Sequence, residues 1–183
     1  MTPIRFGTDG WRARIAGDYT EHNVARVAAA AAKVFWRTGR RADLKVGPYV
    51  LVGYDGRFRS EAFGDIAARA LATGGCRVSL ATRVTPTPAL SWSVVEARAD
   101  WGISLTASHN PGMYHGFKIR QRTGAAATPE LTTEIEKEMA IMGSGGAAPY
   151  AVGVGTAHPS SDGIKRIDFV PGYLKGLRAH ADL

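Results

Sequence analysis

The residues best suited to chemistry lie in the segment 101–118, which reads WGISLTASHNPGMYHGFK. Its first residues form an apolar run that predicts a buried strand, and the polar loop 106–111 follows directly. In open α/β sheets, ligands bind at the carboxyl ends of strands. Small residues before Ser108 allow a tight turn that exposes its hydroxyl, and Pro111 limits continuation into a helix. Ser108 is therefore a candidate nucleophile.

Three polar residues lie near Ser108 in the sequence: His109, Asn110 and Lys118. Each can hydrogen-bond an anion, and His and Lys can also transfer protons. A hydrolase triad is poorly supported, because adjacent residues tend to point apart and the Gly-x-Ser-x-Gly elbow is missing. An ordinary surface loop with a solvated lysine is the plain alternative. Spacing alone leaves both interpretations open.

The elements that must position this loop follow from apolar periodicity. Runs rich in strand formers predict strands at residues 49–54, 77–81, 101–106 and 116–120. Helical spacing predicts helices that begin near residues 20, 60, 85 and 128, where Thr, Ser or Pro stands at the start. The alternation predicts the α/β class, a three-layer α/β/α sandwich around a mixed, mostly parallel sheet of about four strands.

The composition changes after residue 142. Residues 143–163 are rich in Gly, Ala, Ser and Pro without periodicity, which indicates a loop. Helical spacing returns with Tyr173, Leu174 and Leu177. We therefore expect a first domain over residues 1–142, a loop or linker over 143–165 and a connecting helix over 166–183.

Length and charge narrow the function classes. The chain has 183 residues, 45% of them hydrophobic, and a formal net charge of +7, which suits one basic globular domain. The basic residues are scattered and form no long Lys/Arg block, so a solvated surface is favoured over a nucleic-acid partner. No apolar run approaches the roughly 20 residues of a membrane span, and the first ten residues do not read as a secretory signal. The lone Cys76 fits a reducing compartment, so we expect a cytoplasmic protein without membrane or nucleic-acid partners.

Four motifs in order resemble the α-D-phosphohexomutase family of phosphoglucomutases and phosphomannomutases. They are FGTDGWR at residues 6–12, VGYDGR at 52–57, TPTP at 85–88, and TASHNP at 106–111 followed by GFK at 116–118. The likeness covers roughly residues 4–142. Four ordered motifs are far more specific than one short loop.

The resemblance implies that Ser108 carries a phosphoryl group. Members pass it to a hexose phosphate, form a bisphosphorylated sugar and recover the other phosphate, a reaction that depends on positioning and electrostatics. Arg12 is implied to bind phosphate, and Lys118 to act as general acid/base or as a charge partner of the phosphate. His109 and Asn110 are implied to hydrogen-bond the phosphoryl group or substrate hydroxyls.

Other residues are expected to act indirectly. Asp9 is expected to fix the N-terminal loop, and Asp55 and Arg57 to pair with each other or brace the serine loop. The sequence departs from the family pattern at Gly112 and His115, where the family usually has Pro and Asn. These departures leave the serine and the lysine in place but put the stiffness of the loop and the role of His115 in doubt.

The resemblance also implies Mg²⁺, bound through the Ser108 phosphate and three aspartates of an Asp-Gly-Asp-x-Asp-Arg loop, and glucose 1,6-bisphosphate as the priming phosphate donor. The sequence contains neither that loop nor the family's Glu-x-Ser-Gly-His sugar loop. We therefore expect the first of four domains, with a hexose phosphate and the remaining domains of the same polypeptide as partners. Without the other ligands and a closed cleft, the chain alone is expected to have little or no mutase activity.

Three alternatives remain. The first is a phosphoglucosamine mutase. Trp11 favours the branch that acts on glucose or mannose phosphates, because phosphoglucosamine mutases usually have Ile at this position. A stand-alone, non-catalytic domain that binds phosphosugars or other anions predicts a stop codon after Leu183, whereas a mutase predicts an open frame. A basic nucleic-acid-binding module predicts salt-dependent DNA retention but does not explain the four motifs.

Overall fold

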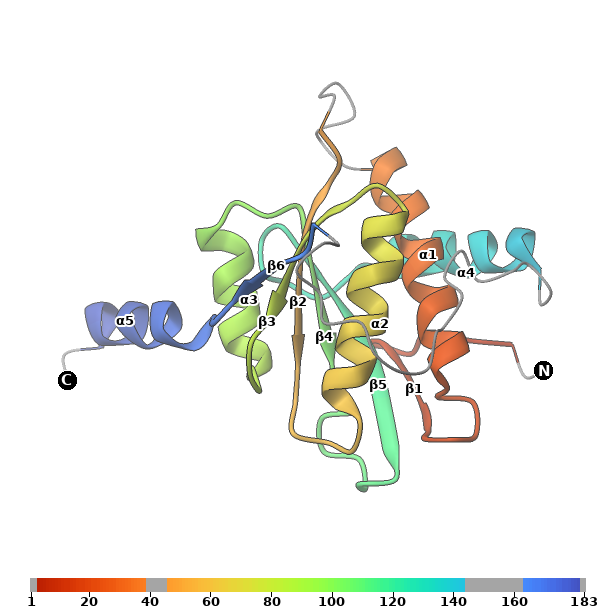
Figure 1. Ribbon diagram of the computed structural model, residues 1–183, viewed down its shortest axis with the longest axis horizontal. Helices are drawn as coiled ribbons and strands as arrows, with labels where there is room; N and C mark the ends of the chain where they lie inside the picture. Colours follow the sequence, from red (N-terminus) through yellow and green to blue (C-terminus); the bar gives the residue numbers. More distant parts are fainter. Residues whose placement is uncertain (1–2, 39–45, 144–162, 182–183) are drawn as a thin grey trace.

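The computed structural model describes residues 3–38, 46–143 and 163–181 (Figure 1). Within these ranges, six strands form one sheet: β1 (Trp11–Arg14), β2 (Tyr49–Tyr54), β3 (Arg77–Ala81), β4 (Trp101–Leu105), β5 (Tyr114–Gln121) and β6 (Lys165–Ile167). The same ranges contain five helices: α1 (Glu21–Thr38), α2 (Ser60–Thr73), α3 (Thr87–Glu96), α4 (Pro129–Met142) and α5 (Val170–His180).

The strand order across the sheet is β1-β5-β4-β2-β3-β6. Strands β4, β2, β3 and β6 run parallel to one another, and β5 is antiparallel to both β4 and β1. The predicted α/β class and the mixed, mostly parallel sheet are confirmed. The predicted number of about four strands is wrong, because β1 and β6 have only four and three residues and complete the two edges of the sheet. Periodicity cannot reveal strands that short.

The C-terminal segment differs in detail from its expected boundaries. The strand β6 occupies Lys165–Ile167, and the terminal helix begins at Val170 instead of residue 166. Residues 144–162, most of the expected linker, lie outside the described residues. In Figure 1, α5 extends away from the sheet at one end of the molecule.

Helices cover both faces of the sheet. Neighbouring residues of β2 point to opposite faces, and each meets a different helix. A side chain at Gly53 would meet Leu90 of α3, whereas the neighbouring Tyr54 packs against Gly64 of α2. Helix α1 lies on the α2 side, where Phe35 stacks on Trp101 with ring centroids 4.5 Å apart. Helix α4 packs against α1. The result is the three-layer sandwich, with its core between the sheet and these helices.

Thr20 caps the first helix as expected, and several large apolar side chains remain exposed. Thr20 accepts a hydrogen bond from the Asn23 amide at 3.2 Å, and α2 spans the predicted residues 60–73. Leu174 and Leu177, whose spacing predicted the terminal helix, are 46% and 41% exposed, and Val95 of α3 is 52% exposed. Gly39, whose type favours the end of the first helix, lies outside the described residues. No helix in the described part of the chain is long and apolar enough to span a bilayer.

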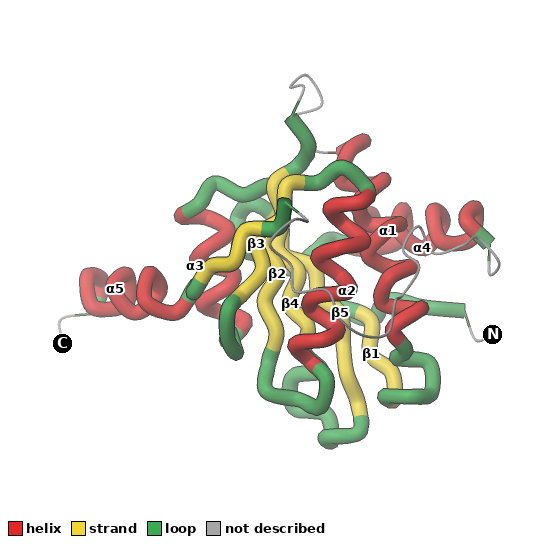
Figure 2. The backbone as a smooth tube through the Cα atoms, viewed as in Figure 1, coloured by secondary structure: helices red, strands yellow, loops and turns green. Residues whose placement is uncertain are grey.

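Loops that follow β2, β3 and β4 gather at one edge of the sheet, as Figure 2 shows below the strands. Two backbone hydrogen bonds link them to neighbouring strands: the Asp55 amide donates to Leu105 at 3.1 Å, and the Thr85 amide donates to Tyr54 at 2.8 Å. Because parallel strands end together, three of the four motifs meet at this edge.

Candidate functional site

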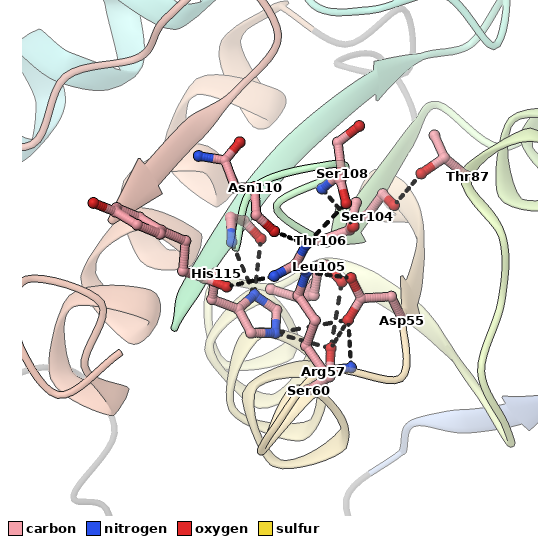
Figure 3. A network of polar contacts seen from close by, with 12 residues as sticks. Asp55, Arg57, Ser60, Thr87, Ser104, Leu105, Thr106, Ser108, Asn110 and His115 are labelled. Carbon is pink, nitrogen blue, oxygen red and sulfur yellow. Dashed lines mark hydrogen bonds and ion pairs between the residues drawn. The ribbon is translucent and has the colours of Figure 1, made fainter. Parts of the chain in front are cut away.

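The serine loop, residues 106–113, joins β4 to β5 at this edge. Ser108 adopts a left-handed conformation with φ of 59°, and its amide donates to Thr106 Oγ1 at 3.0 Å. The residue is exposed, and its side chain points away from the polar network under the loop (Figure 3). A left-handed non-glycine residue is strained, so the surrounding contacts must hold the loop in this shape.

Arg57 supplies most of those contacts. Its Nη1 donates to the carbonyl oxygens of Pro111 and Tyr114, both at 3.0 Å, and its Nη2 donates to those of Ser108 and Asn110 at 2.8 and 2.7 Å. Thus one guanidinium binds four carbonyls spread over the loop and the start of β5. A planar group with five N–H donors suits this arrangement, whereas a lysine offers a point charge.

Asp55 orients that guanidinium. Its Oδ2 lies 3.1 Å from Arg57 Nε, and its Oδ1 accepts from the Arg57 amide at 2.9 Å. Oδ1 also accepts from the hydroxyl of Ser60 at 2.8 Å. The carboxylate therefore joins the loop after β2 to the first residue of α2. Ser60, expected to cap α2, directs its side chain into this network instead, and Arg59 occupies the capping position without a side-chain cap.

His115 completes the network from β5 and is fully buried. The Gly116 amide donates to its Nδ1 at 2.9 Å, so we assign the neutral ring with hydrogen on Nε2, which lies 2.9 Å from Ser60 Oγ. Burial lowers the pKa of His115; the Asp55 carboxylate and a contact with the Gly116 carbonyl oppose this, and Arg57 adds to it. The ring is therefore an uncharged donor to Ser60.

Aromatic rings enclose His115 on the α1/α2 side of the sheet. Tyr19 stacks on it at a centroid distance of 4.7 Å, and Phe63 meets its edge at 5.1 Å. Trp11 stacks on the other side of Tyr19 at 4.7 Å. Burial, with Asp55 nearby, raises the pKa of Tyr19 well above its usual range, and its hydroxyl donates to the Gly116 carbonyl at 2.9 Å. These contacts restrict the orientation of the imidazole.

A basic strip, Arg12, Lys118 and Arg120, lies on the opposite face of β1 and β5. Arg12 pairs in register with Gly116, and residues 116, 118 and 120 face the side opposite 115, 117 and 119. All six are buried, with Lys118 5% and Arg120 8% exposed. Arg12 Nη1 donates to Asn110 Oδ1 at 3.0 Å, which connects the strip to the serine loop. The cations of the other two residues meet one carboxylate, that of Asp9.

Asp9 lies between Lys118 and Arg120. Lys118 Nζ donates to Asp9 Oδ2 at 2.7 Å, and Arg120 Nη2 lies 3.2 Å from Oδ1. A turn closed by the Gly7 amide and the Gly10 carbonyl presents Asp9 there, and Gly10 has φ of 106°. A Cβ at Gly10 would lie 2.6 Å from the Phe117 carbonyl, so only glycine fits this crossing. Asp9 thus contacts the strip directly and does more than order its own loop.

The structure brings Arg12 and Arg57 into contact with the serine loop, Arg12 through Asn110 of that loop, and it pairs Asp55 with Arg57 and Lys118 with Asp9. His109 is exposed and makes no hydrogen bond with the described residues. Sequence reasoning did not assign a site role to three residues: Tyr19, Ser60 and Arg120. Of these, only Arg120 had a readable signal, because it shares the strand face of Lys118.

A hollow of about 530 Å³ lies near Asp9, between residues 5–10 and the start of α4. Its lining includes Thr132 and Glu136 but no residue of the serine loop. Glu136 accepts hydrogen bonds from Arg5 at 2.6 Å and from the Phe6 amide at 2.7 Å. Ser108, which is exposed, does not line this hollow.

Comparison with known proteins gives a consistent result. Residues 3–143 match the family "Phosphoglucomutase/phosphomannomutase, alpha/beta/alpha domain I". A phosphoglucosamine mutase of Salinispora arenicola is 34% identical over 97% of this chain and 40% of its own length. A phosphoglucomutase of Staphylococcus epidermidis is 36% identical over 74% of this chain and 25% of its own length.

Solved structures agree. A crystal structure of a candidate phosphomannomutase from Thermus thermophilus has a TM-score of 0.80 and 33% identity, covering 99% of this chain and 37% of that one. The chain spans about 40% of the length of the first curated relatives that it matches.

Proposed function

Because the chain belongs to the phosphoglucomutase/phosphomannomutase family through its alpha/beta/alpha domain I, we propose that it is the phosphoserine-bearing domain of a phosphohexomutase. The observation that carries the proposal is the serine loop itself. Ser108 is exposed in a left-handed turn that four Arg57 hydrogen bonds hold, and Arg12 reaches the same loop through Asn110. A fixed, exposed hydroxyl beside cations is what reversible phosphoryl transfer requires.

The proposed step exchanges one ester for another. The bond between Ser108 Oγ and phosphorus breaks, a bond forms between a hydroxyl oxygen of the hexose phosphate and phosphorus, and the hydroxyl proton ends on Oγ. The resulting bisphosphorylated sugar turns and returns its other phosphoryl group to Ser108 by the reverse exchange. Atoms balance without an external reductant or oxidant, and the protein supplies positioning and positive charge.

The basic strip supplies that charge. Arg12 is half-buried and held by Asn110, so its guanidinium is available near the loop with restricted motion. We assign Lys118 the role of general acid/base or charge partner, and Asp9 the role of holding its ammonium at 2.7 Å until phosphate arrives. His109 is exposed and free to reach substrate oxygens, which supports its assignment as a hydrogen-bond donor.

The substrate class in this proposal is a hexose phosphate. Trp11 was expected to favour glucose or mannose, but it is 3% exposed and stacks on Tyr19 on the face opposite Arg12. It cannot touch the sugar, so its identity concerns packing. The phosphoglucosamine mutases among the relatives that match over 97% of the chain favour glucosamine phosphate as a second candidate.

Mg²⁺ belongs to the proposal only for the complete protein. A hard cation takes six or more oxygens, and the Ser108 phosphate would supply a minority of them. Among the described residues no group of three or more His, Cys, Asp or Glu side chains could hold a metal ion, and Asp55 is already engaged by Arg57 and Ser60. The donors present here do not complete a magnesium site.

The complete gene product should be assayed with the 1-phosphates of glucose, mannose and glucosamine, with the matching bisphosphate as primer. We expect interconversion with the 6-phosphate for at least one sugar, and phosphate on Ser108 by mass spectrometry. The 183-residue chain alone should show little or no turnover, because Ser108 is open to solvent and water is not excluded. Robust turnover by this chain would contradict the second expectation, and absence of phosphate on Ser108 in an active enzyme would contradict the proposal. We also propose that the protein is cytoplasmic, which cell fractionation would test.

A further inference from the structure

Building on the proposed function, we propose that Ser60 and His115 are positioning residues for the serine that carries the phosphate. Together they fix the carboxylate of Asp55, and through Asp55 they fix the guanidinium of Arg57, which holds the serine loop. Neither Ser60 nor His115 reaches the outer surface on which Ser108 lies, since they are 2% and 0% exposed. They act on the reaction through the shape of the loop.

The loop needs such support because its carbonyl oxygens converge. Those of residues 108, 110, 111 and 114 all point at the terminal nitrogens of Arg57, within 2.7 to 3.0 Å. Four partial negative charges at one place repel one another unless a cation lies between them. Each of the four terminal N–H bonds has its own carbonyl, so a rotated guanidinium would lose several contacts together. The left-handed Ser108 is held by the same contacts.

The position of the guanidinium depends in turn on Asp55. One carboxylate oxygen faces Arg57 Nε at 3.1 Å. The other accepts from the Arg57 amide at 2.9 Å and from Ser60 Oγ at 2.8 Å. With donors on both oxygens, the carboxylate cannot turn about its bond without losing one of them. Of the groups that donate to Asp55 in the described structure, only the Ser60 hydroxyl belongs to a helix or strand. The Ser60→Ala substitution would remove this donor.

His115 determines which way the Ser60 hydroxyl points. A hydroxyl has one hydrogen to give, and Ser60 Oγ lies 2.8 Å from Asp55 Oδ1, 2.9 Å from His115 Nε2 and, at the longer distance of 3.4 Å, from the Leu105 carbonyl. The Gly116 amide occupies Nδ1, so Nε2 carries hydrogen and donates to Ser60 Oγ. The Ser60 hydrogen is then directed to Asp55. The three hydrogen bonds are donated in sequence: from the Gly116 amide to His115, from His115 to Ser60, and from Ser60 to Asp55.

This chain of hydrogen bonds also reaches the far end of the loop. Asp55 follows β2, Ser60 begins α2, and His115 is the second residue of β5, where the serine loop ends. The buried network therefore ties the loop to one rigid helix and one rigid strand. A purely structural role would affect the stability of the whole domain, whereas a positioning role affects the loop and the rate of transfer.

The first test uses the 183-residue chain with Ser60→Ala. We expect backbone amide NMR signals of residues 108–114 to shift and their hydrogen exchange to accelerate, while amides of β2 and β3 change little. The nitrogen signals of His115 should show loss of the Nε2 hydrogen bond. The matched control is Ser93→Ala in α3, which removes a helical hydroxyl that donates to the Ala89 carbonyl at 2.8 Å and should leave the loop amides unchanged. Unchanged loop amides in Ser60→Ala overturn the proposal.

The second test measures kinetics in the complete gene product. Ser60→Ala should lower kcat by about tenfold to a hundredfold with KM changed less than about twofold, because misplacement of the reacting group affects transfer more than binding. Ser93→Ala should keep both constants. A KM effect alone, or no effect on kcat, contradicts positioning.

The two tests separate this inference from the proposed function. If the complete wild-type protein lacks mutase activity, the proposed function fails, and the NMR test still decides whether the network shapes the loop. If the wild type is active and Ser60→Ala matches it in both tests, only the positioning inference fails. If Ser60→Ala is too unstable to measure, Ser60→Cys keeps the size and a weak donor; it should give the same pattern at smaller amplitude, and unaltered loop amides in it would also refute the inference.

Discussion

On the buried side of the serine loop, each polar group has a partner: carbonyls meet Arg57, Arg57 meets Asp55, and Asp55 meets Ser60 (Figure 3). On the outer side, Ser108 and His109 are exposed, and the described residues provide no hydrogen-bond partner for the Ser108 hydroxyl. The two sides are separated by one layer of backbone. The polar groups on the buried side are hydrogen-bonded, whereas the Ser108 hydroxyl on the outer side is available to react.

The difference shows how the domain divides its tasks. Donors on the outer side stay available for a ligand because the loop takes its stability from the inner side. The basic strip differs from the outer side of the loop, because Lys118 is buried and already donates to Asp9, while His115 and Phe117 point to the other face of the sheet. Substitutions on the two sides should therefore affect different properties.

The largest expected effect is on the outer side. Ser108→Ala in the complete gene product should lower turnover by on the order of a thousandfold or more, because no other group can accept the phosphoryl. The melting temperature of the chain should hardly change, since the exposed hydroxyl makes no hydrogen bond with the described residues. Steady-state assays and thermal melts measure the two effects. Unchanged turnover would remove Ser108 from its role.

The next effect comes from the inner side. Arg57→Lys keeps the charge but cannot bind four carbonyls, so kcat should fall by roughly a hundredfold. Unlike Ser108→Ala, this variant should also lower the free energy of unfolding, by about 2 kcal/mol. Urea titrations and kinetics on the same preparations measure both. A loss of activity without any loss of stability would contradict the idea that Arg57 supports the loop from within.

A third effect concerns stability at the junction of loop and strand. A Cβ at Gly116 would lie 2.4 Å from the Thr106 carbonyl, so Gly116→Ala should cost roughly 2–3 kcal/mol of unfolding free energy. Gly112, on the outer side, has no atom within 4 Å of an added Cβ, and Gly112→Ala should be nearly neutral. Equal costs for the two substitutions would contradict the close approach of the Thr106 carbonyl to Gly116.

The smallest effect is a dependence on pH. His115 has a lowered pKa in the fold, so as the pH falls below about 6.5 the unfolded chain binds a proton that the folded chain does not. The unfolding free energy should therefore fall with falling pH, by at most about 1.4 kcal/mol per pH unit from this group, until the folded pKa is reached. The charged or titratable groups around the ring are Asp55, Arg57 and Tyr19.

The variant His115→Asn should show a weaker dependence between pH 6.5 and the onset of acid unfolding. His180→Asn, in the exposed last turn of α5, should retain the wild-type slope. Chemical denaturation at a series of pH values gives both slopes. An unchanged slope in His115→Asn would mean that the buried ring does not contribute.

Several features of the fold follow from local patterns. The α2 boundaries, the Thr20 cap and the class of the sheet were predictable because periodicity and capping are short-range properties. The edge strands β1 and β6 were not, because their few residues become strands only by pairing with β5 and β3. The exposure of Val95 likewise depends on what packs against α3.

The α/β class, the family and the place of Ser108 at the end of a strand could be predicted from motifs and periodicity, because these are local properties of the chain. The contacts of Ser60 with both Asp55 and His115, and the position of Asp9 between Lys118 and Arg120, became known only from the folded structure. Ser60 and His115 are 55 residues apart along the chain, and Asp9 and Lys118 are 109 residues apart. Such contacts arise from strand order and register, which bring distant residues to the same edge and face of the sheet.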